Sequence, residues 1–195
     1  KPMQVFLEQN PCFVPGAWTP GAPSGHSPLH TALISQPQLS GLRSRQPDFM
    51  WISTHSATWY PTLIEIESPT KLIFKGDAIP THQFTQARNQ LAQWRAWFSE
   101  PVNIQKFVSE YGIPESYTKF RRMQPHFILI YGRRDEFENN EELSKQRAVI
   151  MSGPDEELIS FDRLHPDLKL RNAIAVHATG FGRYRACAIM PTIEM

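Results

Sequence analysis

The chain has 195 residues, of which 41% are hydrophobic and 20% charged, and its formal net charge is +1. This ordinary globular composition excludes global disorder and collagen-like repeats, and the length predicts a single domain. The small net charge excludes a strongly basic, histone-like binder, although a DNA enzyme needs basic residues along one groove only.

Other global features restrict the class of protein further. No apolar run approaches the roughly 18–20 residues that a membrane helix requires, so no membrane association is expected. The two cysteines, Cys12 and Cys187, are too few for a disulfide framework and fit a reducing compartment, which predicts a cytoplasmic protein. Because the first residue is Lys1, we expect a piece of a longer protein.

The first quarter of the chain is mostly irregular. Met3–Gln9 predicts a short helix that ends before Asn10-Pro11, because a residue preceding proline avoids the helical region. Residues 11–47 are rich in proline and glycine and predict a long irregular segment, with a strand or a helical turn at Leu29–Leu33. A loop of this length in a small domain is usually functional or mobile.

The middle of the chain predicts a hairpin followed by a helix. Asp48–Ile52 and Thr62–Glu67 have the apolar character of strands, and Ser53–Tyr60 fits the connection between them. The clearest helix is Thr81–Glu100, with Thr81 as its N-cap. One apolar stripe follows it at steps of three and four residues, formed by Phe84, Ala87, Leu91, Trp94 and Phe98.

The second half alternates between helices and strands. In chain order we expect a helix at Ile104–Tyr111, a strand at His126–Tyr131, a helix at Glu141–Met151, a strand at Leu158–Phe161 and a helix or turn at Asp162–Leu170. The last stretch is ambiguous, with two candidate strands at Ala173–His177 and Tyr184–Met190. Interleaved strands and helices predict an α/β or α+β domain with a mixed central sheet flanked by helices.

Two carboxylates stand out on the second predicted strand. Glu65 and Glu67 are two residues apart, so both face the same side of a strand that is otherwise apolar. Like charges in an apolar setting repel each other and lose hydration, and a divalent cation offsets both penalties. Hard carboxylate oxygens suit Mg²⁺ or Mn²⁺. The alternative is that both acids face solvent on a half-exposed strand.

Asp48 supplies a third carboxylate. It opens the preceding predicted strand, directly after Pro47. If the two strands pair as antiparallel neighbours, Asp48 and Glu65 come to one point.

These motifs resemble the PD-(D/E)xK nuclease superfamily and, more closely, the Shedu antiphage-defence proteins. The resemblance begins with Pro47-Asp48-Phe49 and with Ile64-Glu65-Ile66-Glu67-Ser68-Pro69. Four further segments follow the Shedu pattern, namely Phe6–Pro11, Gln86–Leu91, Ile128–Arg133 and Ile159–Leu164. Together the six segments span about residues 3–168 in the family's order.

The resemblance implies a restriction-endonuclease-like fold that hydrolyses DNA phosphodiesters in antiphage defence. It implies a duplex DNA substrate and a homo-oligomer. Asp48 and Glu65 would hold Mg²⁺, with Mn²⁺ as a substitute and Glu67 as a further ligand. Glu8, on the first helix, would be an outer carboxylate of the site or, alternatively, a solvated helix acid.

One position departs from the superfamily pattern. The pattern places a lysine two residues after the acid, where it stabilises charge developing on the phosphate, and this chain has Glu67 there. Three readings follow. Lys71 or Lys75 reaches the site from a neighbouring position, with Lys71 preferred; Glu67 binds a second metal ion; or the domain is catalytically inactive.

A glutamine stripe follows the predicted central helix beside its apolar stripe. It is formed by Gln83, Gln86, Gln90 and Gln93, and Gln86 and Gln90 match the family motif. Glutamine both donates and accepts hydrogen bonds, so this pair could orient a water molecule or contact a phosphate. The alternative is an ordinary polar helix flank.

Basic residues cluster between Tyr117 and Arg134, a stretch without acids. Arginine suits bidentate phosphate binding, so the candidate DNA contacts are Arg121, Arg122, Arg133 and Arg134. The alternative is a solvated surface.

Other chemistries find little support in the sequence. His26 and His30 share the proline-rich segment, but no cysteine or acid has ligand spacing to them, so we expect no zinc site. Nucleophile-elbow, P-loop and Rossmann glycine patterns are absent from the sequence. Three hypotheses therefore remain: a magnesium-dependent nuclease, a nuclease-fold domain that binds DNA or assembles an oligomer without cutting, and an unrelated α/β domain with surface acids.

Overall fold

The computed structural model describes residues 2–18, 26–41, 46–76, 78–150 and 153–187. Its centre is an eight-stranded mixed sheet with the order β6-β5-β3-β2-β1-β7-β8, and β4 pairs with β3 beside this path. The strands are β1 (Ala32–Ser35), β2 (Phe49–Thr54), β3 (Thr58–Ile66), β4 (Arg122–Met123), β5 (His126–Ile130), β6 (Glu156–Ile159), β7 (Ile174–Gly180) and β8 (Arg183–Ala186).

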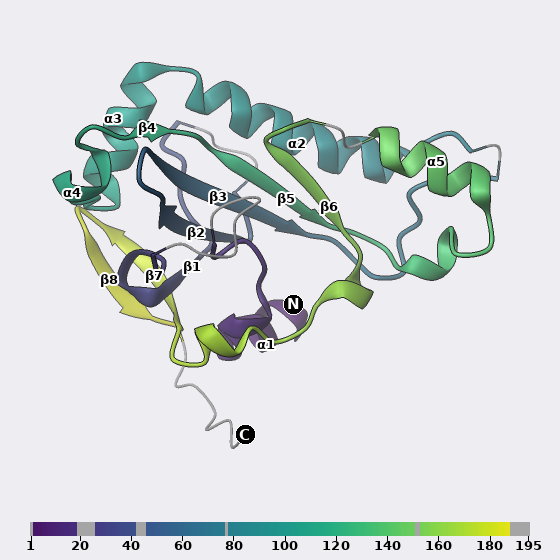
Figure 1. Ribbon diagram of the computed structural model, residues 1–195, viewed down its shortest axis with the longest axis horizontal. Coiled ribbons are helices and arrows are strands. Elements are labelled where there is room, and N and C mark those ends of the chain that lie inside the picture. The colour runs from purple at the N-terminus through teal and green to yellow at the C-terminus, as the bar shows by residue number, and fades with distance from the viewer. Residues whose placement is uncertain (1, 19–25, 42–45, 77, 151–152, 188–195) are drawn as a thin grey trace.

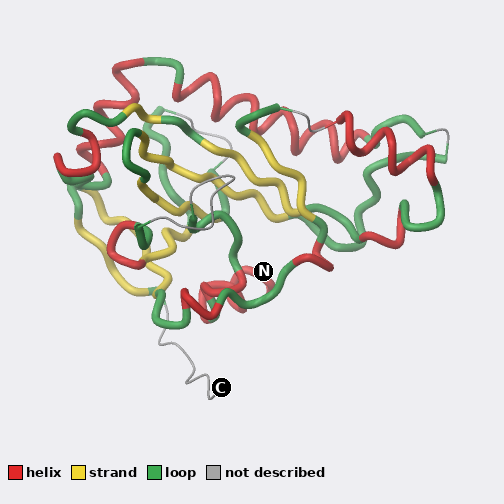
Figure 2. Tube along the Cα trace, viewed as in Figure 1, coloured by secondary structure: helices red, strands yellow, loops and turns green. Residues whose placement is uncertain are grey.

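Helices cover the two faces of the sheet unequally (Figures 1 and 2). The helices are α1 (Pro2–Gln9), α2 (His82–Phe98), α3 (Pro101–Glu110), α4 (Glu115–Thr118) and α5 (Glu141–Ile150). In Figure 1, α2, α3 and α5 lie along one face, whereas α1 lies on the opposite side. No helix in the described part of the chain combines the length and apolar character needed to cross a membrane.

The larger core lies between α2, α3 and the sheet. The predicted apolar stripe of α2 is buried at every position, from Phe84 to Phe98. Thr81 caps the helix, since its side chain accepts a hydrogen bond from the Phe84 amide at 3.2 Å. The strand residues that meet this stripe include Leu63, Phe127 and Leu129. The apolar stripe of the helix and the alternating apolar residues of the strands therefore form one buried layer.

The smaller core covers the opposite face. Leu7 from α1 and Val14 from the following segment pack with Trp51, Ile64 and Ile128. This irregular segment approaches the sheet closely at Gly16, where an added Cβ would lie 2.7 Å from the side chain of Ile128. A residue with a side chain would not fit there without displacing the segment.

The mixed α/β class predicted from the sequence is confirmed, with several corrections. The strand or helical turn expected at Leu29–Leu33 is present as a 3-10 turn at Leu29–Thr31 followed by β1, which lies inside the sheet between β2 and β7. The hairpin connection is shorter than predicted, because β2 and β3 continue to Thr54 and Thr58. The short elements α4 and β4 were not predicted, and residues 19–25, 42–45, 151 and 188–190 of the predicted segments lie outside the described residues.

Candidate functional site

The carboxyl end of β3 brings two of the predicted acids together. β2 and β3 are antiparallel, with Phe49 opposite Ile64, so the next pair in this register joins Asp48 to Glu65. The Asp48 amide donates to the Ile64 carbonyl at 3.1 Å. The Asp48 side chain in turn accepts a hydrogen bond from the Ile66 amide at 2.8 Å. The hairpin register predicted from the sequence therefore places Asp48 beside the acidic strand.

Glu65 belongs to the α2 side of the sheet. It lies two residues after Leu63, which packs in the α2 core, and side chains alternate along a strand. The residue is half-buried, and its Oε2 atom is hidden from solvent. A buried carboxylate oxygen at a strand end is expensive unless charge or hydrogen bonds compensate it. This burial distinguishes Glu65 from a solvated surface acid.

Glu67 follows the end of β3 and is paired with a lysine. Its amide donates to the Ile130 carbonyl at 3.0 Å, which keeps residue 67 attached to β5 beyond the strand end. Its Oε2 atom lies 2.5 Å from Nζ of Lys71, and both side chains are partly buried. A cation therefore lies next to the position where the superfamily pattern has its lysine.

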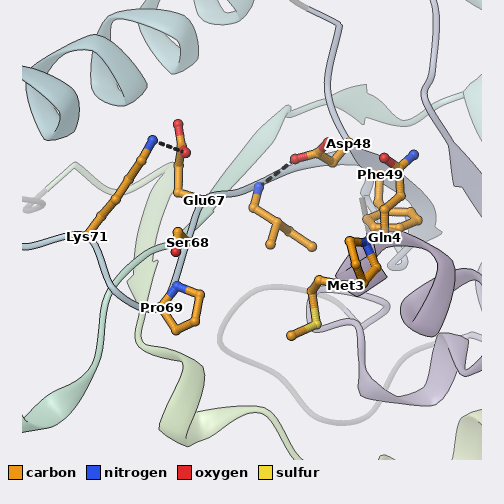
Figure 3. A pocket seen from close by; sticks show the side chains of 10 residues that line it. Met3, Gln4, Asp48, Phe49, Glu67, Ser68, Pro69 and Lys71 are labelled. Atoms are coloured by element: carbon orange, nitrogen blue, oxygen red, sulfur yellow. Dashed lines mark hydrogen bonds and ion pairs between the residues drawn. The ribbon is translucent and has the colours of Figure 1, made fainter.

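A pocket of about 400 Å³ opens beside these residues. Figure 3 shows Glu67 and Lys71 pointing toward each other on one side of it, Asp48 on the other, and Met3 and Pro69 along its wall. Glu65 is not one of the lining residues. Of the predicted site residues, Asp48, Glu67 and Lys71 therefore line one pocket, beside the strand end that carries Glu65.

The segment that carries Lys71 is fixed by residues that the sequence analysis did not single out. The Glu136 carboxylate accepts hydrogen bonds from the amides of Ile73 and Phe74, at 3.0 and 2.7 Å. Gly132 has φ +63°, and an added Cβ there would lie 2.8 Å from the Lys71 carbonyl oxygen. The sequence indicated Gly132 only as the residue that closes the predicted strand His126–Tyr131, and β5 ends two residues before it.

The acids at this site fit a hard cation with few protein ligands. Among the described residues, three potential metal ligands lie within 4.8 Å of one another in a cluster elsewhere, and Asp48, Glu65 and Glu67 are not part of it. A Mg²⁺ ion is usually bound by one or two carboxylates, while water and substrate phosphates complete its shell. Asp48 and Glu65, opposite each other on adjacent strands, are the pair that could hold it.

The two predicted glutamines lie on α2 outside the buried stripe. Gln86 is exposed and Gln90 is half-buried, and neither lines the pocket beside Asp48. Their role in orienting water or phosphate stays a prediction.

The four predicted arginines separate into two pairs at opposite ends of β3. Arg133 and Arg134 follow β5, whose last residue pairs with Ile66 at the acidic end. Arg122 lies on β4 and pairs with Thr58, at the other end of a nine-residue strand. At about 3.3 Å per residue, the two ends of β3 are about 26 Å apart. One phosphate group cannot contact both pairs.

The environments of the two arginine pairs also differ. Arg121 donates to the backbone carbonyls of His55 and Ser116, so it ties the β2–β3 turn to α4. Arg133 is paired with Asp162 at 3.2 Å. The Arg134 amide also donates to Asp162, and this hydrogen bond is the main cause that lowers the pKa of the Asp162 carboxyl. Arg133 and Arg134 are therefore held at the acidic end of the sheet.

Glu8, predicted as an outer carboxylate or a solvated helix acid, is half-buried and hydrogen-bonded. Its carboxylate accepts a hydrogen bond from Ser35 Oγ at 2.5 Å, and it is not a lining residue of the Asp48 pocket. Ligand atoms of Glu8, His177 and Cys187 all lie within 4.8 Å of one another. Burial, and then the charge of Glu8, raises the pKa of the Cys187 thiol to about 11. Residue spacing could not reveal this cluster, because Glu8 is more than 160 residues away from both His177 and Cys187 in the sequence.

Comparison with known proteins identifies the family of the chain. The family model described as Shedu protein SduA, C-terminal, matches residues 1–165. No curated protein and no solved structure gives a significant match. The matched region contains α1, the acidic strand pair, α2 and β5, and it covers most of the 195 residues. The chain therefore belongs to the Shedu family of antiphage-defence proteins.

Proposed function

We propose that this domain is a metal-dependent endonuclease that cuts or nicks duplex DNA. The observation that carries the proposal is the register of β2 and β3, which sets Asp48 opposite Glu65 at one strand end. The Lys71–Glu67 ion pair lies at the same end, on the wall of the same pocket as Asp48. Two carboxylates beside a cation are the groups that a PD-(D/E)xK nuclease uses.

Asp48 and Glu65 would hold a Mg²⁺ ion, and Mn²⁺ would replace it. When bound, such an ion polarises a phosphate and lowers the pKa of a coordinated water. The residues fit this ion because their donors are hard carboxylate oxygens, one of them buried. The Ile66 amide orients the Asp48 carboxylate through its 2.8 Å hydrogen bond, so Asp48 is positioned before any ligand arrives.

Lys71 would supply the positive charge that Glu67 cannot. Its ammonium group is held by the Glu67 carboxylate, and its amide donates to the Ser68 carbonyl at 3.2 Å. From this position Lys71 can stabilise negative charge that develops on a phosphate at the pocket. Lys75, the other candidate, is exposed and does not line the pocket. Glu67 then acts as the residue that positions Lys71.

The DNA backbone would pass Arg133 and Arg134, which lie at the same end of the sheet as the acids. Arginine guanidinium groups there would neutralise phosphates flanking the cut. Self-association, which the family likeness implies, is a separate proposal that light scattering of the intact protein would test.

A plasmid assay tests the proposal directly. Supercoiled DNA is incubated with the intact chain, with and without Mg²⁺ or Mn²⁺, beside Glu65→Gln and Lys71→Met variants. We expect metal-dependent nicking that falls about 10³-fold in Glu65→Gln and about 10²-fold in Lys71→Met. Lys75→Met is the matched control, because this lysine is in the same loop but exposed, and it should keep full activity.

A second function is favoured by one observation, the glutamate at the lysine position of the superfamily motif. In this alternative the domain binds duplex DNA, or assembles the oligomer, without cutting. DNA binding that persists while no metal gives nicking would establish the alternative and reject the nuclease. Equal nicking by the wild type and Glu65→Gln would reject the proposed site.

A further inference from the structure

A second group of potential metal ligands lies away from the acidic end of β3. Glu8 comes from α1, His177 from β7, and Cys187 directly follows β8. α1 packs against β7, so the approach of these residues is a consequence of the fold. All three side chains are half-buried, which makes them neither solvated surface groups nor parts of the apolar core.

The spacing of the ligand atoms is close to that of a tetrahedral site. The atoms lie within 4.8 Å of one another. In tetrahedral zinc coordination, bonds of about 2.0–2.3 Å separate neighbouring ligand atoms by roughly 3.3–3.8 Å. A contraction of at most about 1.5 Å per pair would therefore complete the geometry, a change within the reach of side-chain rotation.

Ser35 orients two of the three ligands. Its Oγ donates to Glu8 Oε1 at 2.5 Å, and its carbonyl oxygen lies 3.2 Å from Nδ1 of His177. A histidine whose Nδ1 donates to a carbonyl carries its lone pair on Nε2, as metal-ligating imidazoles commonly do. The backbone of Cys187 is fixed as well, because its amide donates to the Ala175 carbonyl at 2.9 Å.

The donor set selects the class of ion. A sulfur, an imidazole nitrogen and a carboxylate oxygen suit zinc and similar transition metals, whereas Mg²⁺ avoids thiolate and imidazole ligands. A thiolate and a carboxylate together carry two negative charges, which a divalent ion neutralises. The three ligands also leave a fourth position for water.

We propose that Glu8, His177 and Cys187 bind one divalent transition-metal ion, zinc being the best fit. The ion would join α1 to the β7–β8 hairpin, and so link elements at the two ends of the described residues. His177 and Cys187 lie beyond the family-matched residues 1–165, so the family match does not contain this site. The proposal is independent of the nuclease activity, because it shares no residue with the acidic strand end.

The metal content of the intact protein tests the proposal first. We expect equilibrium dialysis of the metal-free protein to give one tightly bound Zn²⁺ per chain, retained in excess Mg²⁺. Replacement with Co²⁺ should give a near-ultraviolet cobalt–thiolate absorption band, and this readout requires no variant. Substoichiometric Zn²⁺ together with no thiolate band would overturn the proposal, whatever the variants do.

Variants then assign the ligands. Cys187→Ser should abolish the thiolate band, whereas Cys12→Ala, the other cysteine, should keep it. His177→Ala and Glu8→Gln should weaken Zn²⁺ binding by more than 100-fold, and Ser35→Ala, which removes an orienting hydroxyl, by about 10- to 100-fold. His55→Ala is the matched control, because this histidine is exposed in the β2–β3 turn. Unchanged affinity in both His177→Ala and Glu8→Gln would also overturn the site.

Discussion

The two ionisable clusters of this protein are built in contrasting ways. The acidic strand end takes Asp48, Glu65, Glu67 and Lys71 from a stretch of 24 residues on one hairpin and its following loop. The other cluster takes Glu8, His177 and Cys187 from opposite ends of the described chain. The first has hard oxygen donors and a cation, while the second has sulfur and nitrogen donors.

The difference teaches what each cluster can do. A hairpin register fixes two carboxylates opposite each other, so the acidic end is preorganised for Mg²⁺ and phosphate. A cluster that joins distant elements depends on the whole fold, and a bound ion there would stabilise the folded state. The first cluster is therefore suited to chemistry and the second to holding elements together.

The largest expected effect comes from substituting one residue in each cluster and measuring both DNA nicking and Zn²⁺ affinity. Glu65→Gln keeps the shape of the side chain but removes its charge, so DNA nicking should fall about 10³-fold while Zn²⁺ affinity is unchanged. Glu8→Gln should give the reverse pattern. Parallel nicking assays and zinc titrations measure both. Loss of both properties in either single variant would show that the clusters are one site.

A smaller effect is expected from the backbone that supports the acidic end. Gly132→Ala places a Cβ 2.8 Å from the Lys71 carbonyl at φ +63°, and should lower the free energy of unfolding by about 1–3 kcal/mol. Nicking should fall as well, since the Lys71 segment must shift. Gly76→Ala, where an added Cβ meets nothing within 4 Å, is the control and should stay within about 0.5 kcal/mol. Urea unfolding of both variants would decide this.

A third prediction separates a buried histidine, His126, from an exposed one. Burial lowers the pKa of His126 below its usual 6.5. The unfolded state then binds more protons than the folded state between these two pKa values. Stability from this group is therefore full above about pH 6.5 and is lost as the pH falls, by at most about 1.4 kcal/mol per pH unit.

The variant His126→Asn should lack this part of the pH dependence, as measured by urea unfolding of the metal-free protein between pH 7 and pH 5. His55→Asn, at an exposed position, should follow the wild type. An unchanged slope in His126→Asn would contradict the prediction.

The smallest effect concerns the two arginine pairs. Arg133→Ala, at the acidic end, should weaken duplex DNA binding a few-fold and reduce the salt slope by about 1. Arg122→Ala, at the far end of β3, should change the affinity less. Fluorescence anisotropy at several salt concentrations distinguishes these outcomes. A larger loss in Arg122→Ala would move the DNA path to the β4 end of the sheet.

Much of the fold followed from local patterns in the sequence. The buried stripe of α2 and the N-cap Thr81 were predicted because helix periodicity and capping are properties of neighbouring residues. The β2–β3 hairpin was predicted for the same reason, and with it the pairing of Asp48 and Glu65. By contrast, the place of β1 inside the sheet could not be predicted, because its partners β2 and β7 are set by long-range pairing.

The candidate site was predictable to the same extent. Strand register and alternation predicted Asp48, Glu65 and Glu67 at one place, but they could not show which of these acids line the pocket with Lys71. The sequence also suggested one group of four arginines, although the structure places them in two pairs at opposite ends of β3. Glu136, which hydrogen-bonds to the segment after Lys71, is more than 60 residues away from it in the sequence.

The sequence by itself determined the class of fold, the acidic hairpin and the family likeness, because these rest on residues close together in the chain. The tertiary structure alone decided that the arginines divide into two pairs, that Glu136 holds the segment after Lys71, and that Glu8 meets His177 and Cys187. The physical reason is that strand pairing and helix packing bring distant residues together at no fixed spacing. Composition and periodicity therefore do not predict contacts between residues that are far apart in the sequence.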